Sequence, residues 1–156
     1  MKNIPTLYEW AGGRDALTRL MNLFYEKVAL DEVLAPVFKH MSADHSQHVA
    51  HFIGEVFGGP RLYTEGDQGS HHTMIAHHVG KHLNEAKRKR WMALLLETCD
   101  EVGLADDPEF RSALVGYLEW GSRLAVINSA ADQVPVKVDE PMPSWGWGET
   151  GGPYQP

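Results

Sequence analysis

The chain has 156 residues, which is enough for one domain with a single core or one buried cofactor. Its formal charge of −7, with 43% hydrophobic and 22% charged residues, argues against binding to nucleic acid or to an anionic membrane as the main activity. The only cysteine, Cys99, cannot form an internal disulfide, and neither a signal-peptide pattern nor a run of 18 apolar residues is present. These features predict a soluble cytoplasmic protein.

Apolar residues recur at three- and four-residue steps in four stretches, which is the pattern of amphipathic helices. The stretches are residues 17–28, 49–56, 91–102 and 110–125. Asp107 and Pro108 have the residue types of a helix cap and a first helical residue, so we expect the last helix to begin there. Strand-like alternation is absent, and glycines interrupt the pattern at residues 12–13, 58–59 and 66–69. The sequence therefore predicts an all-α fold.

The composition changes after Ala130, so we divide the chain into a helical domain, residues 1–130, and a tail, residues 131–156. The segment from Val134 onward holds five of the nine prolines, together with Trp145 and Trp147. A segment of this kind cannot be a helix, and it is either a disordered tail or an extended strap. A mobile tail is the default interpretation, but two tryptophans are costly to leave in water, which keeps packing on the domain or on a partner as the alternative. Both alternatives stay open here.

Nine histidines lie between Lys39 and Leu83, and such a cluster suggests metal or cofactor chemistry. On the predicted helix before residue 56, His45 shares the inward face of Val49 and Phe52, four and seven residues later. His48 falls at the edge of that face, and we expect His51 on the opposite, solvent-exposed side. An isolated histidine on an apolar face is more often structural than a ligand.

The second histidine cluster is His71-His72-Thr-Met-Ile-Ala-His77-His78. His78 follows Met74 by four residues and His71 by seven, so these three share one side of a helix, whereas His77 points about 100° away. Gly80 is expected to end this short helix just after His78. By itself, this spacing favours His78 over His77 only weakly as a ligand.

Three polar-tipped side chains, Tyr25, His45 and Trp91, are predicted to face one interior from three different helices. A buried hydroxyl or indole N–H must find an acceptor, and packing alone rarely supplies three. A small ligand or water held between them would satisfy all three groups.

The order of these residues resembles the truncated haemoglobins, specifically their group II. The resemblance covers about residues 8–129. It rests on Gly12-Gly13, on Phe24-Tyr25, on Phe38, on Glu55-Val-Phe-Gly-Gly-Pro-Arg-Leu-Tyr63, and on His78 with Trp91 thirteen residues later. A double glycine alone is weak evidence, but the ordered set with both spacings is specific.

The resemblance implies a two-over-two helical sandwich that grips haem b, followed here by the Pro- and Gly-rich C-terminal extension. It makes His78 the proximal iron ligand, neutral, with its other ring N–H donated to a backbone carbonyl. Tyr25 and Trp91 match distal polar residues, and His45 matches the distal-helix site that faces the ligand. The implied haem contacts are Phe38, Val49, Phe52, Tyr63, Met74, His78, Lys81, His82 and Leu95. Among them, Tyr63 and Lys81 or His82 are expected at the propionates.

Two departures concern the ligand side of the pocket. The position of Phe38 is often tyrosine in group II, so one donor is missing, and the position of His45 is frequently small. His45 is therefore expected to donate to the bound ligand, to gate ligand access or to bind iron itself. Donors around bound O₂ would each stabilise it by roughly 1–3 kcal/mol, which suits oxygen-dependent redox chemistry or sensing better than bulk transport.

The expected partners are O₂, CO, NO or similar ligands and an unidentified electron donor, and NO dioxygenase or peroxidase-like activity stays open, as does a homodimer. Two other classes of function also stay open at this point. One is a non-haem metal site built from histidines, and the other is a haem-free interaction module that uses the aromatic tail. The metal site would draw on His45, His48, His71, His77 and His78. Against it, few carboxylates share the inward faces.

Overall fold

The computed structural model describes residues 3–156, and within them it contains helices and no strand. The elements are α1 (Leu7–Ala11), α2 (Gly13–Leu30), α3 (Ala35–Phe38), α4 (His45–Val56), the π-helical turn η1 (Leu62–Gly66), α5 (His71–Ala76), α6 (Glu85–Glu101), α7 (Pro108–Ser129) and the short 3-10 helix η2 (Gly148–Thr150). The all-α prediction is confirmed. None of these helices is both long enough and apolar enough to cross a membrane.

The helix boundaries follow from capping residues in the sequence. Asp107 caps α7 by accepting a hydrogen bond from the Phe110 amide, and Pro108 is the first helical residue, as predicted. Ser70 and Thr73 form a reciprocal capping box at the start of α5. Gly12 joins α1 to α2 with a φ of +105°, a conformation that side chains rarely adopt.

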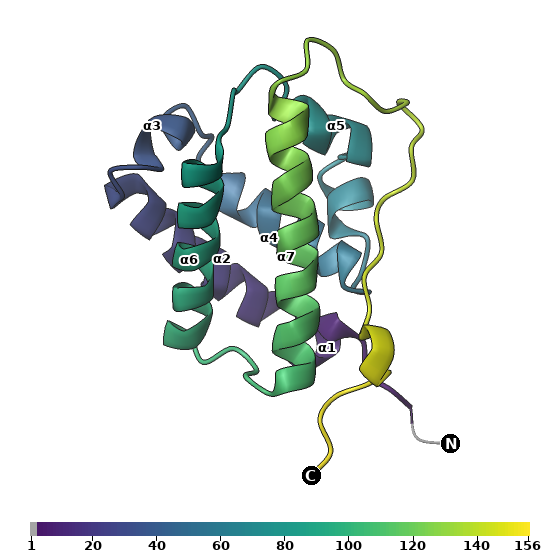
Figure 1. The fold of residues 1–156 in the computed structure, drawn as a ribbon. Helices are drawn as coiled ribbons and strands as arrows, with labels where there is room; N and C mark the ends of the chain where they lie inside the picture. Colours follow the sequence, from purple (N-terminus) through teal and green to yellow (C-terminus); the bar gives the residue numbers. More distant parts are fainter. Residues whose placement is uncertain (1–2) are drawn as a thin grey trace.

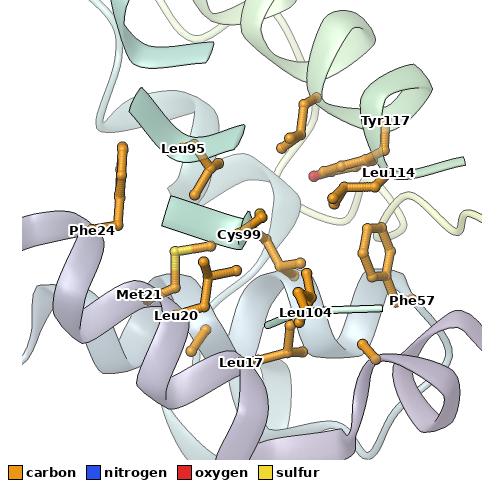
Figure 2. Close-up of a cluster of buried hydrophobic side chains, with 14 of the residues drawn as sticks. Leu17, Leu20, Met21, Phe24, Phe57, Leu95, Cys99, Leu104, Leu114 and Tyr117 are labelled. Atoms are coloured by element: carbon orange, nitrogen blue, oxygen red, sulfur yellow. The ribbon is translucent and has the colours of Figure 1, made fainter. Parts of the chain in front are cut away.

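The helices form two crossed pairs around one core (Figure 1). α6 and α7 stand side by side, and α2 and α4 cross behind them, which is the predicted two-over-two sandwich. Figure 2 shows side chains from both layers meeting in the centre. Those labelled there are Leu17, Leu20, Met21, Phe24, Phe57, Leu95, Cys99, Leu104, Leu114 and Tyr117. The predicted inward faces of α2, α6 and α7 supply most of this core, so hydrophobic burial holds the two pairs together.

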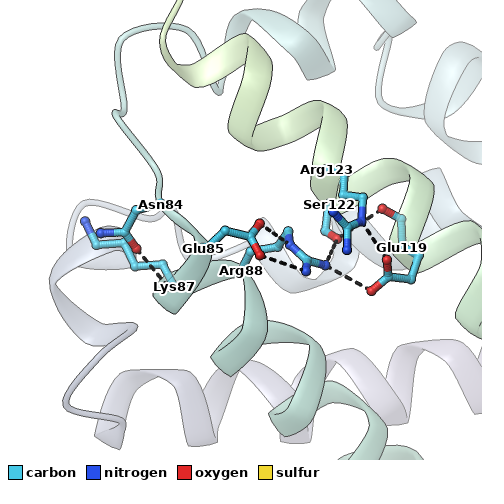
Figure 3. A network of polar contacts seen from close by, with 7 residues as sticks. All are labelled: Asn84, Glu85, Lys87, Arg88, Glu119, Ser122 and Arg123. Atoms are coloured by element: carbon cyan, nitrogen blue, oxygen red, sulfur yellow. Dashed lines mark hydrogen bonds and ion pairs between the residues drawn. The ribbon is translucent and has the colours of Figure 1, made fainter.

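A buried guanidinium joins α6 to α7 near one end of the sandwich (Figure 3). Arg88 donates to Glu85 of its own helix at 2.7 Å and to Glu119 of α7 at 3.0 Å. Glu119 also accepts from Arg123 at 2.7 Å. The Arg88 side chain is only 4% exposed, so its charge depends on these two carboxylates.

Residues 131–156 run as an extended segment along the outside of the helices, from the end of α7 past α5 to the neighbourhood of α1 (Figure 1). Trp145 and Trp147 are half-buried against the core. Of the two alternatives open from the sequence, the structure therefore shows the extended strap.

The prediction for His51 is wrong, because this residue is buried rather than exposed. α4 packs against α2 on one side and against η1 on another, so it has two covered faces instead of one. On the second face, His51 Nδ1 lies 2.8 Å from a carboxylate oxygen of Asp67. Helical periodicity identifies only the apolar face of a helix. It cannot identify a polar face that is buried because a carboxylate from elsewhere in the chain pairs with it.

Candidate functional site

Three aromatic rings from three helices meet where α2, α3 and α4 converge. The rings of Tyr25 and His45 are 4.7 Å apart and perpendicular, and Phe38 lies edge-on to both, at 5.6 Å and 5.9 Å. Edge-to-face contacts of this kind fix ring orientation. The predicted convergence of Tyr25 and His45 on one interior is therefore observed, with Phe38 as the wall between α3 and α4.

His45 carries a nitrogen that has no partner among the described residues. Its Nε2 is buried without a hydrogen bond. Burial, together with the nearby His77, His48 and His78, lowers the pKa of His45 to about 4, while Asp44 opposes the shift. A neutral imidazole with a buried, unpaired nitrogen can donate to or bind a group placed in the same interior.

Tyr25 and Trp91 lie on the α2 and α6 sides of this interior. Tyr25 is buried, and burial raises the pKa of its hydroxyl, an effect that its contact with the Trp91 indole opposes. Phe24 sits edge-on to Trp91 with ring centres 5.8 Å apart. Tyr25 is therefore a neutral O–H group at physiological pH, and Trp91 is half-buried beside it.

His78 has the geometry of a nitrogen ligand. Its Nδ1 lies 2.8 Å from the carbonyl oxygen of Met74, which confirms the predicted bond to a backbone carbonyl and leaves Nε2 as the free nitrogen. Burial lowers the pKa of His78, so the ring is neutral. α5 ends at Ala76, earlier than predicted, and His78 lies in the turn that follows. His77 is exposed.

The other predicted contacts divide into two groups. Val49, Phe52, Met74 and Leu95 are buried or half-buried and pack in or against the core. Lys81 and His82 are exposed in the loop after His78, and the Lys81 amide donates to the His78 carbonyl at 3.1 Å. Of the predicted haem contacts, the apolar side chains therefore lie in the interior, and Lys81 and His82 lie at the protein surface.

Tyr63 is buried and hydrogen-bonded within the protein, whereas from the sequence we expected it at the haem propionates. Its ring is buried against Phe52 at 5.1 Å, and its hydroxyl lies 3.2 Å from Thr73 Oγ1. Gly69 makes this possible, because a Cβ there would lie 2.3 Å from the Tyr63 ring. The hydroxyl thus already has a partner on α5, which ties η1 to that helix.

Asp67 was missed as a site-bordering residue by the sequence reasoning. It accepts from His51 and lies 3.9 Å from His48 Nε2, so it holds the loop before α5 against α4. A single carboxylate in a loop leaves no periodic pattern in the sequence. The only related signal is the pair His48 and His51 on the predicted helix, which such a carboxylate could contact.

The alternative non-haem metal site finds no support in the structure. Across residues 3–156, no group of three or more His, Cys, Asp or Glu side chains is placed to hold a metal ion. The five histidines of that hypothesis are spread over α4, α5 and the turn after α5, and His77 among them is exposed.

The residues around the interior where Tyr25 and His45 meet have the chemistry that an iron porphyrin needs. Such a group needs one neutral imidazole with a free nitrogen, apolar side chains against its faces, and polar groups on the opposite side. His78 provides the first, Val49, Phe52 and Met74 the second, and Tyr25 with the unpaired Nε2 of His45 the third.

Comparisons with known proteins agree with this fit. The family model "Bacterial-like globin" matches residues 6–120. The group 2 truncated haemoglobin YjbI of Bacillus subtilis is 30% identical over 120 residues, which cover 77% of this chain and 88% of that protein.

Two solved structures have the same fold. The truncated oxygen-avid haemoglobin of Bacillus subtilis superposes with a TM-score of 0.68 at 30% identity, covering 78% of this chain and 99% of that one. The thermostable haemoglobin of Thermobifida fusca gives a TM-score of 0.68 at 27% identity, covering 85% and 100%. The chain therefore belongs to the bacterial-like globin family and is a truncated haemoglobin of group II.

Proposed function

We propose that this protein binds haem b between α4 and α5 and holds O₂ or another diatomic ligand on the α4 side. The observation that carries the proposal is a pair of neutral imidazoles, one at the start of α4 and one in the turn after α5. His78 has its Nδ1 occupied by Met74, and His45 has a buried, unpaired Nε2. The two rings are close enough that charge on His78 disfavours charge on His45.

When bound, the haem iron supplies the bond to the diatomic ligand. His78 would hold the iron through Nε2, with the Met74 carbonyl fixing its ring orientation. Phe38, Val49, Phe52, Met74 and Leu95 would exclude water from the porphyrin, and Lys81 or His82 would face its propionates. The hydroxyl of Tyr63 is taken up by Thr73, so we assign this residue to packing against the haem rather than to the propionates.

Tyr25 and Trp91 would donate hydrogen bonds to the ligand, with His45 as a gate or third donor. Each donor contributes roughly 1–3 kcal/mol when the acceptor carries charge. Two of them slow ligand dissociation by orders of magnitude, because about 1.4 kcal/mol is a factor of ten. Slow release suits oxygen-dependent redox chemistry on NO or peroxide, or sensing, with an electron donor that restores the reduced state. The similar truncated haemoglobin of Bacillus subtilis is oxygen-avid, which supports such a pocket here.

Two single variants test the haem site. His78→Ala is expected to lose haem or bind it much more weakly, because it removes the imidazole whose Nε2 is left free by the Nδ1 contact with the Met74 carbonyl. His77→Ala is the matched control, since His77 is adjacent but exposed, and it is expected to retain haem. The measurement is the Soret absorbance after reconstitution and gel filtration. Haem loss in His77→Ala with retention in His78→Ala would contradict the assignment.

A further inference from the structure

The C-terminal tail makes specific contacts that the proposed function does not use. The family match ends at residue 120, so residues 131–156 lie outside it. The backbone N–H of Trp145 donates to the carbonyl of Val56, the last residue of α4, at 2.9 Å. The indole ring packs on Tyr117 at 5.6 Å and Trp120 at 5.7 Å, and over Gly116, where a Cβ would be 3.6 Å from it. Trp145 therefore joins the end of α4 to the middle of α7.

A second tryptophan fastens the tail further along. The Trp147 indole N–H donates to the carbonyl of Pro5 at 2.8 Å, and its ring lies 6.1 Å from Trp10 and 6.4 Å from Phe110. The tail is thus held at two successive points on the same side of the molecule, where Figure 1 shows it descending toward α1.

The tail also runs past α5, the helix on the other side of the proposed haem (Figure 1). Burial lowers the pKa of His71, the first residue of α5, and the nearby Glu140 carboxylate of the tail opposes that shift. Ser129, the last residue of α7, accepts hydrogen bonds from the backbone amides of His82 at 3.1 Å and Leu83 at 2.9 Å, in the loop after His78. The tail is therefore hydrogen-bonded to the end of α4 and runs past α5, and the last residue of α7, just before the tail, is hydrogen-bonded to the loop that leaves α5.

These contacts can set the relative position of the two helices. α4 has 12 residues and spans about 18 Å at 1.5 Å per residue. His45 is its first residue and Val56 its last. Because a helix of this length is stiff, fixing the position of Val56 also restricts the position of His45. The loop between α4 and α5 is held to α4 through Asp67 and to α5 through Tyr63, and the tail adds a second connection to α4 that does not run through this loop.

We propose that the tail is a positioning element of the haem pocket, with Trp145 as its main anchor. It holds α4 and α5 at the separation that the haem requires and fixes the place of His45 in the pocket. The prolines at 135, 141 and 143 restrict the free tail to extended conformations, which lowers the entropy lost when it docks. This inference rests on the proposed haem binding, but the contacts that carry it belong to the protein alone.

The test compares Trp145→Ala with Trp145→Phe, and Val138→Ala serves as a surface control because Val138 is 77% exposed in the same tail. Hydrogen–deuterium exchange of the haem-free protein is the first readout. Trp145→Ala is expected to raise exchange in residues 45–56 and 71–78 at least tenfold relative to residues 85–101, which the tail does not anchor. Trp145→Phe should restore most of the protection, since it keeps the amide and an aromatic ring.

The haem-loaded protein supplies the second readout, the rate of haem transfer to excess apomyoglobin together with the absorption spectrum. Trp145→Ala is expected to speed transfer at least tenfold and to change the proportion of high-spin and low-spin haem, because His45 moves. If Trp145→Ala does not fold, Gly116→Leu displaces the indole while keeping Trp145. Increased exchange confined to α7 and the tail, with unchanged haem transfer, would overturn the proposal. A protein that binds no haem would refute the proposed function, whereas the exchange measurement would still decide the role of the tail.

Discussion

Replacing Tyr25 by Phe removes one oxygen atom from a buried ring and little else. Tyr25 is 6% exposed and is held by Phe24, Phe38 and His45, so phenylalanine fits the same space. The variant loses one donor to the bound ligand, worth roughly 1–3 kcal/mol, which corresponds to a roughly 5- to 150-fold faster dissociation of O₂. Trp91→Phe should act in the same direction, and the double variant should exceed either single one.

The assay is stopped-flow displacement of O₂ by CO, repeated from pH 6 to pH 9. Burial raises the pKa of Tyr25 above its ordinary value, so its hydroxyl stays protonated over this range. The ratio of the wild-type and Tyr25→Phe rates should therefore be independent of pH. Unchanged rates in both single variants and in the double variant would refute the reasoning and leave Tyr25 and Trp91 as packing residues.

The remaining predictions concern His45 and Arg88. If His45 is a gate or donor, the ferrous protein will show a five-coordinate high-spin spectrum; low-spin bands that vanish in His45→Ala would instead make it an iron ligand. Because the unfolded state binds the His45 proton more tightly, with a pKa of 6.5 against about 4 when folded, His45 should by itself remove up to about 2 kcal/mol of unfolding free energy from the haem-free protein between pH 7 and pH 5. Urea unfolding measures this loss, and His45→Phe should abolish that share of it. Arg88→Met should cost about 1–3 kcal/mol, since its charge is buried while its partners can return to water. Arg123→Met, which removes a 58% exposed partner of the same Glu119, should cost less than about 1 kcal/mol, and equal losses would argue against the buried network.

The helices could be predicted from the sequence because their signals are local. The apolar repeats of α2, α6 and α7 and the Asp107-Pro108 start depend on residues within one or two turns of each other. The hydrogen bond from His78 to Met74 is likewise a four-residue contact. These features depend on neighbouring residues alone, so they can be predicted without knowing how the rest of the chain folds.

Only the tertiary structure decided which surfaces are covered by distant residues. His51 is buried because Asp67, sixteen residues later, supplies a carboxylate, and a polar face with such a partner leaves no apolar repeat. Trp145 docks because Val56 offers an unpaired carbonyl at a helix end and Gly116 leaves room beside Tyr117. Helical spacing predicted that His45 faces inward, but its neutral form is decided by burial and electrostatic neighbours, which depend on all the packed elements together. The chain's own periodicity fixes its helices, and the pairing of separated polar and aromatic groups fixes the pocket between them.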